Sequence, residues 1–234
     1  MQTTTDDTNS HEDDLKKLEL DIREAIAHGG NIKEAVHKLT LNAMQANRLD
    51  IDSLGRIATA VLQGIREGAH QKLALASEQS HFAKDQISHA VSGLDTAFAQ
   101  FVGASKLAVE EAAGKAKQFS REELSKTRAD LESLESLFLE TLQRTASTAQ
   151  GLIADTLNDL LIHAKRNGTT IGEQLKDTLA TFTHQLSSVS HSQIEASLQL
   201  AQTTADLLHK ISSGILSGIS EQTKRNDSGN KHNT

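Results

Sequence analysis

Residues 87–101 read ISHAVSGLDTAFAQF, and their apolar side chains decide the fold class. These side chains follow one another at steps of three and four: Ile87, Ala90, Leu94, Phe98 and Phe101. Side chains with this spacing share one face of an α-helix. The rhythm extends over residues 73–119 with a mean step of about 3.5 residues, the spacing of a coiled-coil seam. The pattern predicts one continuous helix over residues 52–118, roughly 100 Å long at about 1.5 Å per residue.

The amino-acid composition supports an all-α protein. The 234 residues include 30 Leu and 28 Ala, which are the strongest helix formers, and no Pro, which breaks helix interiors. The chain has no Cys, so disulfides, thiolate zinc sites, iron–sulfur clusters and cysteine nucleophiles are excluded. Six Phe with no Tyr or Trp are too few for a β-sandwich or a cofactor pocket. We therefore expect long amphipathic helices that form an elongated antiparallel bundle or coiled coil.

Helix start and stop signals divide the N-terminal part of the chain into three helices. A helix over residues 12–28 ends at two consecutive glycines, which are common C-terminal stops. Asn31, with Glu34 three residues later, resembles a capping box that opens a helix over residues 32–47. Apolar residues with a period near 3.6 connect these helices to the start of the third. We expect residues 12–67 to form a small three-helix head that folds on its own.

A second set of signals marks a break near residues 119–120. Ser120-Arg121-Glu122-Glu123 is a capping box, and Phe119 and Leu124 on either side of its start form a hydrophobic staple. The chain either reverses or kinks here, and we favour reversal because the preceding seam needs a partner to cover it. Residues 68–166 are therefore expected to form a long helical hairpin or a kinked rod.

Three glycines lie inside the predicted long helix, at Gly93, Gly103 and Gly114. Each costs up to about 1 kcal/mol relative to Ala in a helix interior. Gly103 and Gly114 are three turns apart and therefore lie on one face. Two interpretations remain open: a close backbone crossing with another helix, or glycines that the helix surface tolerates.

Residues 167–222 are predicted to form a Ser/Thr-rich amphipathic helix that differs chemically from the others. Residues 168–220 contain six charged side chains and sixteen Ser or Thr, and a capping box at Thr170 opens the helix. The helix either packs on the preceding helices or lies on an apolar surface. An amphipathic helix with an uncharged polar face binds through buried apolar area and not through anionic lipids. The residues expected to contact such a surface are Phe182, Leu186, Leu208, Ile211, Ile215 and Ile219.

Charge and motifs argue against several functions. The net charge is −7 and the basic residues form no extended cluster, so nucleic-acid binding is not expected. The eleven His include no pair four residues apart and no His-Glu-x-x-His motif, so we expect no metal. The chain has neither a phosphate-binding glycine loop nor a Gly-x-Ser-x-Gly elbow. We expect no enzyme and no cofactor.

The ends of the chain are polar. Residues 1–11 form an acidic stretch without the features of a signal peptide, and residues 223–234 lack apolar periodicity, so both are expected to be disordered tails. No apolar run approaches the ~20 residues that span a bilayer. We expect a cytoplasmic protein without a transmembrane segment, peripheral on granules or membranes where it binds them.

Residues 101–113, FVGASKLAVEEAA, resemble the Phe-, Ala-, Lys- and Glu-rich amphipathic helices of bacterial phasins. The likeness covers residues 70–145 and is one of composition. Phasins coat polyhydroxyalkanoate granules and self-associate through coiled-coil segments, so the resemblance implies a granule coat. Taken whole, the chain is also similar to an uncharacterised bacterial helical family, which implies no activity.

Two functions follow from these observations. The first is a non-catalytic amphipathic coat or interaction protein that binds a polymer granule or lipid surface and forms homo-oligomers. The alternative is a soluble coiled-coil scaffold or adaptor whose head docks a protein partner. The residues expected at the self-association seam are Leu94, Phe98, Phe101, Leu131, Leu134 and Phe138.

Overall fold

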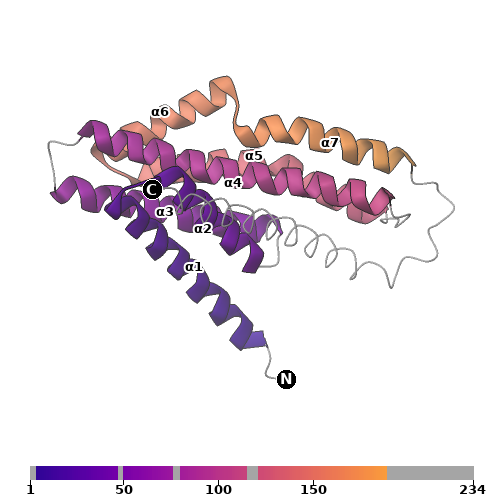
Figure 1. Ribbon diagram of the computed structural model, residues 1–234, viewed down its shortest axis with the longest axis horizontal. Helices are drawn as coiled ribbons and strands as arrows, with labels where there is room; N and C mark the ends of the chain where they lie inside the picture. Colours follow the sequence, from indigo (N-terminus) through magenta and orange to yellow (C-terminus); the bar gives the residue numbers. More distant parts are fainter. Residues whose placement is uncertain (1–3, 47–49, 76–79, 115–120, 189–234) are drawn as a thin grey trace, which may run out of the picture.

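The computed structural model describes residues 4–46, 50–75, 80–114 and 121–188. Over these ranges the chain is helical, with no strand, which confirms the all-α prediction (Figure 1). The described helices are α1 (Thr4–His28), α2 (Ile32–Ala46), α3 (Ile51–Leu75), α4 (Ser80–Gly114), α5 (Arg121–Thr148), α6 (Gly151–Asn167) and α7 (Thr170–Ser188).

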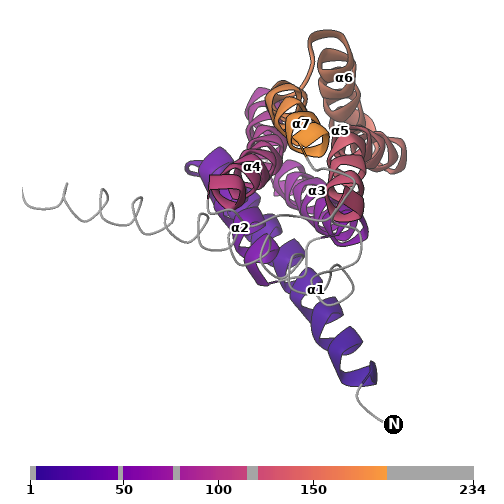
Figure 2. The same cartoon turned by 90° about the vertical axis from the view of Figure 1, so that its right-hand side faces the viewer.

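Helices α3 to α7 are arranged like a four-helix bundle. Helices α3, α4 and α5 form three of its positions, and α6 and α7 together form the fourth (Figure 1). Helix α3 packs against α4 and α5, and α7 packs against the same two helices from the other side. In Figure 2, α4 and α5 therefore occupy opposite corners, with α3 and α7 between them. Helix α6 covers the remaining part of the groove between α4 and α5.

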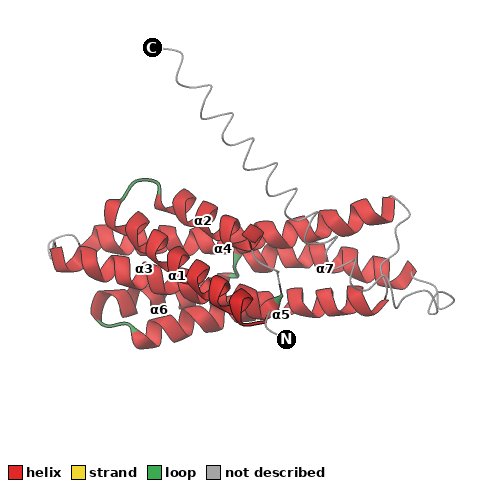
Figure 3. Ribbon diagram, turned by 90° about the horizontal axis from the view of Figure 1, so that it is seen from below, coloured by secondary structure: helices red, strands yellow, loops and turns green. Residues whose placement is uncertain are grey.

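The hairpin of α1 and α2 packs across the outside of this bundle, α1 along α3 and α2 along α4 (Figure 3). Glycines make these crossings close. A Cβ on Gly64 would lie 2.5 Å from the carbonyl oxygen of Glu19, and a Cβ on Gly93 would lie 2.5 Å from that of Lys33. Of the two interpretations left open for the glycines of the predicted long helix, a close backbone crossing therefore applies to Gly93. At Gly103 a Cβ would meet only the Gln174 side chain, at an ordinary 3.5 Å.

Short local signals end α1 and start α2 and α3 as expected, whereas α1 begins at Thr4, within residues 1–11 that were expected to be a disordered tail. Gly29 and Gly30, with φ of +79° and +99°, end α1 in the left-handed region that glycine tolerates. The Asn31 side-chain oxygen accepts a hydrogen bond from the backbone N–H of Glu34 at 3.3 Å. The Asp50 carboxylate accepts one from the N–H of Ser53 at 2.7 Å and so caps α3.

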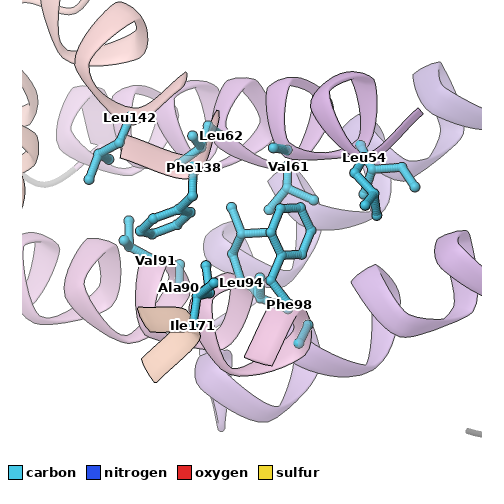
Figure 4. Packing of buried hydrophobic residues seen from close by; sticks show 14 of the residues in the cluster. Leu54, Val61, Leu62, Ala90, Val91, Leu94, Phe98, Phe138, Leu142 and Ile171 are labelled. Atoms are coloured by element: carbon cyan, nitrogen blue, oxygen red, sulfur yellow. The ribbon is translucent and has the colours of Figure 1, made fainter. Parts of the chain in front are cut away.

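One hydrophobic cluster runs through the whole described fold, from Leu18 in α1 to Phe182 in α7. Phe98, Phe138 and Phe182 are its largest fully buried side chains. Figure 4 shows Phe98 and Phe138 among aliphatic side chains of α3, α4 and α5. The three helices of the predicted head share this core with α4 to α7, and independent folding of residues 12–67 stays a prediction.

The prediction of one helix over residues 52–118 is wrong. Helix α3 ends at Leu75, α4 begins at Ser80, and the two helices pack side by side in opposite directions (Figure 1). A straight rod would leave its Ala-rich stripe in water, whereas folding back buries the stripe between helices.

The expected hairpin over residues 68–166 is also corrected. The break near residues 119–120 lies outside the described residues, and the two helices on either side of it run in opposite directions, as a reversal requires (Figure 1). However, α4 and α5 lie at opposite corners and do not form the seam of a two-helix hairpin. The helix expected to continue to residue 166 is interrupted after Thr148, because Gly151 adopts a φ of +55°.

Candidate functional site

Helix α7 is amphipathic with a single buried face. Its fully buried side chains recur every three or four residues: Ile171, Leu175, Thr178 and Phe182. This face fills the groove between α4 and α5. The opposite face carries Glu173, Lys176 and Asp177, all exposed, and no Asp, Glu, Lys or Arg follows Asp177 within the helix. The structured part of the Ser/Thr-rich segment therefore covers the bundle with its apolar side only.

Two carboxylates from other helices hold the N-terminus of α7. The Asp95 carboxylate on α4 accepts hydrogen bonds from the backbone N–H groups of Thr170 and Ile171, at 2.9 and 3.1 Å. The Thr169 hydroxyl donates to Glu135 on α5 at 2.6 Å. Asp95 thus satisfies N–H groups that a helix start leaves free, and its charge complements the helix dipole.

The predicted capping box at Thr170 is displaced by one residue. The Thr169 hydroxyl, and not that of Thr170, accepts the hydrogen bond from the N–H of Gly172, at 2.9 Å. Gly172 also has a packing role, because a Cβ there would lie 2.5 Å from the Glu135 carboxylate. Sequence reasoning missed Asp95 and Glu135, which lie far from α7 in the chain and carry no local signal.

Farther along α7 the polar contacts with α4 are longer. The Thr178 hydroxyl lies 3.4 Å from the carbonyl oxygen of Val102, and Lys106 Nζ lies 3.9 Å from the exposed carboxylate of Asp177. A hollow of about 510 Å³ opens beside this contact, lined in part by Gly103, Leu107 and Gln174. The seam between α4 and α7 is therefore filled less completely on this flank.

A second hollow, of about 580 Å³, lies between α1, α3 and α5. Leu15, Ile51 and Leu137 line it together with charged residues of both signs. Glu19 is one of these residues: burial raises its pKa, and the carboxylate of Glu67 raises it further. The hollow is open to solvent and combines apolar and charged lining residues. We name it the α1/α3/α5 groove.

The described residues were also compared with the requirements of a metal site and of a membrane span. Over the ranges that the structure describes, no three His, Cys, Asp or Glu side chains gather closely enough to bind a metal ion. None of the described helices is both long and apolar enough to cross a membrane. The two hollows described above are both open to solvent.

The residues predicted for self-association lie inside the monomer. Leu94, Phe98, Leu131, Leu134 and Phe138 are buried in the core cluster, and Phe101 is partly buried against it. The apolar seam read from the sequence is therefore an intramolecular one. The pattern could not distinguish the two, because a helix face has the same period whether a second chain or the same chain covers it.

The residues predicted for surface binding divide into two groups. In α7, Phe182 is fully buried and Leu186 is partly buried, so neither forms an exposed surface in this packing. The other four, Leu208, Ile211, Ile215 and Ile219, lie outside the described residues. Among the residues that the structure describes, the exposed large apolar side chains are Leu20, Phe82, Leu107 and Ile162, spread over α1, α4 and α6.

These features define an all-α bundle protein with a one-faced helix closing the groove between α4 and α5. The chain belongs to a family of unknown function (DUF6781), whose model matches residues 8–225. Neither a curated protein nor a solved structure gives a significant match. The prediction of an uncharacterised helical family is confirmed to this extent.

Proposed function

We propose that this chain is a non-catalytic, phasin-like protein that binds an apolar surface, a polymer granule or a lipid droplet, through its Ser/Thr-rich C-terminal segment. The observation that supports this function is the chemistry of residues 168–220. An apolar stripe with helical spacing is paired with a polar face that has no formal charge between Asp177 and Glu195. Such a helix gains its binding energy from buried apolar area, because it offers few charges for anionic headgroups.

Flotation with neutral-oil droplets tests the function. Purified protein is mixed with triolein droplets covered by phosphatidylcholine, or with phosphatidylserine vesicles, at low and high salt. We expect binding to the droplets that persists at high salt, and weaker binding to the vesicles. Binding that requires phosphatidylserine and is lost at high salt would contradict an apolar mode.

A matched pair of variants locates the binding segment. Ile215→Asp places a charge on the predicted apolar stripe and should reduce droplet binding at least tenfold. Ser213→Asp adds the same charge about 160° around the same predicted helix, where binding should persist. Equal binding by both variants would exclude this stripe. In cells, a fluorescently tagged chain should form rings around inclusions or droplets.

A soluble scaffold or adaptor is the second candidate, and the α1/α3/α5 groove favours it. Its apolar and charged lining residues resemble the surfaces that accept an amphipathic helix of a protein partner. This function predicts a diffuse signal in cells and a partner complex that Thr59→Trp, which fills the groove, abolishes. Ring-shaped localisation that is unchanged in Thr59→Trp would exclude it.

Homo-oligomerisation also stays a proposal. Because the predicted seam is used inside the monomer, self-association requires other surfaces or an exchange of helices between chains. Static light scattering should give a mass above the 25.3 kDa of one chain. A single monomeric species at micromolar concentration would refute it.

A further inference from the structure

We infer that α7 moves out of the groove between α4 and α5 and presents its buried face to the apolar surface. This inference rests on the apolar-surface function proposed above. Phe182 and Leu186 carry the apolar stripe of α7, yet they pack on the bundle. The bundle and an external surface therefore compete for the same side chains. Binding through this helix requires that it leave the groove.

The contacts of α7 suit a movement about its N-terminus. The shortest hydrogen bonds to the rest of the bundle lie at its first residues, where Asp95 and Glu135 hold the turn at 2.6 to 3.1 Å. Farther along, the Thr178 contact with α4 is 3.4 Å and the Lys106–Asp177 pair is 3.9 Å. The polar contacts are thus short at the start of α7 and longer beyond it, which makes the start the point about which the helix would pivot.

The α6–α7 elbow provides the pivot. Gly168, with a φ of +86°, and Thr169 are the only residues between the two helices. The hollow beside Gly103 and Gln174 leaves the α4 flank of α7 partly unfilled, so less side-chain interlocking opposes separation there. Helix α6 stays packed on α5 and α4 and holds the elbow in place.

The chemistry of α7 selects an apolar, weakly charged surface as the occupant. The face that opening would release consists of Leu175 and Phe182, with the uncharged Thr178, whereas Ile171 stays at the anchored start. No Asp, Glu, Lys or Arg lies between Asp177 and the end of α7, so anionic headgroups gain little from it. A droplet or granule surface can replace the apolar contacts that α7 loses when it leaves the bundle.

A disulfide that joins α7 to α4 tests the movement. Because the chain has no native Cys, the introduced thiols can pair only with each other. A Cβ built on Gly103 lies 3.9 Å from Cγ of Gln174, so the double variant Gly103→Cys/Gln174→Cys places two thiols at facing positions of α4 and α7. Loss of free thiol on oxidation of the monomer shows that the bridge has formed. We expect the oxidised protein to lose droplet binding at least tenfold and reductant to restore it. The matched controls are the single variants Gly103→Cys and Gln174→Cys, which cannot form this bridge within one chain and should bind equally with and without reductant.

A sole Trp reports the same event in the otherwise native chain. The chain has no Trp, so Phe182→Trp can be followed by fluorescence with droplets covered by brominated phosphatidylcholine. Bromines quench a Trp that reaches the lipid, and we expect strong quenching at position 182. Phe138→Trp, buried in α5, is the control and should be quenched much less.

The outcomes separate the two levels of the proposal. If oxidised Gly103→Cys/Gln174→Cys binds as well as its reduced form, and Phe182→Trp is not quenched, α7 does not open and the apolar-surface function stands without it. If the wild-type and reduced proteins do not bind droplets at all, the function itself fails. Oxidation to a disulfide-linked dimer would show that α7 exchanges between chains and would overturn the inference.

Discussion

Replacing Gly64 of α3 by Ala would place a methyl group against the backbone of α1. The new Cβ would lie 2.5 Å from the Glu19 carbonyl oxygen and 2.9 Å from Cβ of Ile22. Neither atom can rotate away, because one belongs to the backbone and the other is bonded to it. Helix α1 must therefore move off by about 0.5–1 Å to restore ordinary contact, which loosens the packing of its buried side chains.

The magnitude follows from two opposing terms. Overpacking of a well-filled interface costs about 1–3 kcal/mol, and replacing a helical Gly by Ala returns up to about 1 kcal/mol. We expect Gly64→Ala to lower the free energy of unfolding by about 1–2 kcal/mol. For a chain of this size that corresponds to a Tm lower by about 2–8 °C.

A second glycine gives a control with the opposite sign. In Gly103→Ala the methyl group meets only the flexible Gln174 side chain at 3.5 Å, so the gain in helix propensity remains. We expect a rise in stability of about 0.5–1 kcal/mol. Gly68→Ala, whose Cβ would lie 2.8 Å from the Arg23 carbonyl oxygen, should be destabilised like Gly64→Ala.

Circular dichroism at 222 nm, followed against temperature and urea, measures all three variants. The expected order of stability is Gly103→Ala, wild type, then Gly64→Ala and Gly68→Ala. If Gly64→Ala and Gly68→Ala are as stable as the wild type, α1 does not cross α3 as closely as the structure places it. A uniform increase in all three would show that helix propensity alone governs these positions.

Three further predictions concern α7 and the α1/α3/α5 groove. Asp95→Ala removes the cap of α7 and should lower the urea midpoint by the equivalent of about 0.5–2 kcal/mol. Asp85, exposed on the same helix, is the control, and Asp85→Ala should leave the midpoint unchanged. Equal midpoints for the two variants would contradict capping of α7 by Asp95. Phe182→Ala should lower the free energy of unfolding by about 3–5 kcal/mol, whereas Leu107→Ala, at a half-exposed position, should lower it little. Thermal unfolding measures both variants. A small effect of Phe182→Ala would show that α7 is not part of the core. Burial raises the pKa of Glu19 in the folded state, so the contribution of Glu19 to stability falls as pH rises through the range just above 4.5. Glu19→Gln should therefore flatten this part of the curve of stability against pH. If urea unfolding from pH 4 to 7 gives the same curve for Glu19→Gln and the wild type, this prediction is refuted.

The local signals of the sequence were sufficient for the fold class and for several helix ends, but not for the ends of α3 and α5 or the starts of α4 and α6. The two glycines after His28 and the Asn31 cap predicted the turn between α1 and α2 because they act over four residues or fewer. The buried stripe of α7 was likewise visible from its spacing. The Thr170 cap was misplaced by one residue, since the true cap also depends on Glu135.

The sequence by itself determined that the chain is all-α and which face of each helix is apolar, because helix propensity and periodicity are properties of neighbouring residues. Only the tertiary structure decided what covers each face: the reversal between Leu75 and Ser80, the opposite corners of α4 and α5, and the hold of Asp95 on α7. Pairings between residues far apart in the chain depend on how the apolar faces are buried together. The period of a stripe is the same whether its partner is the same chain, a second copy or an apolar surface.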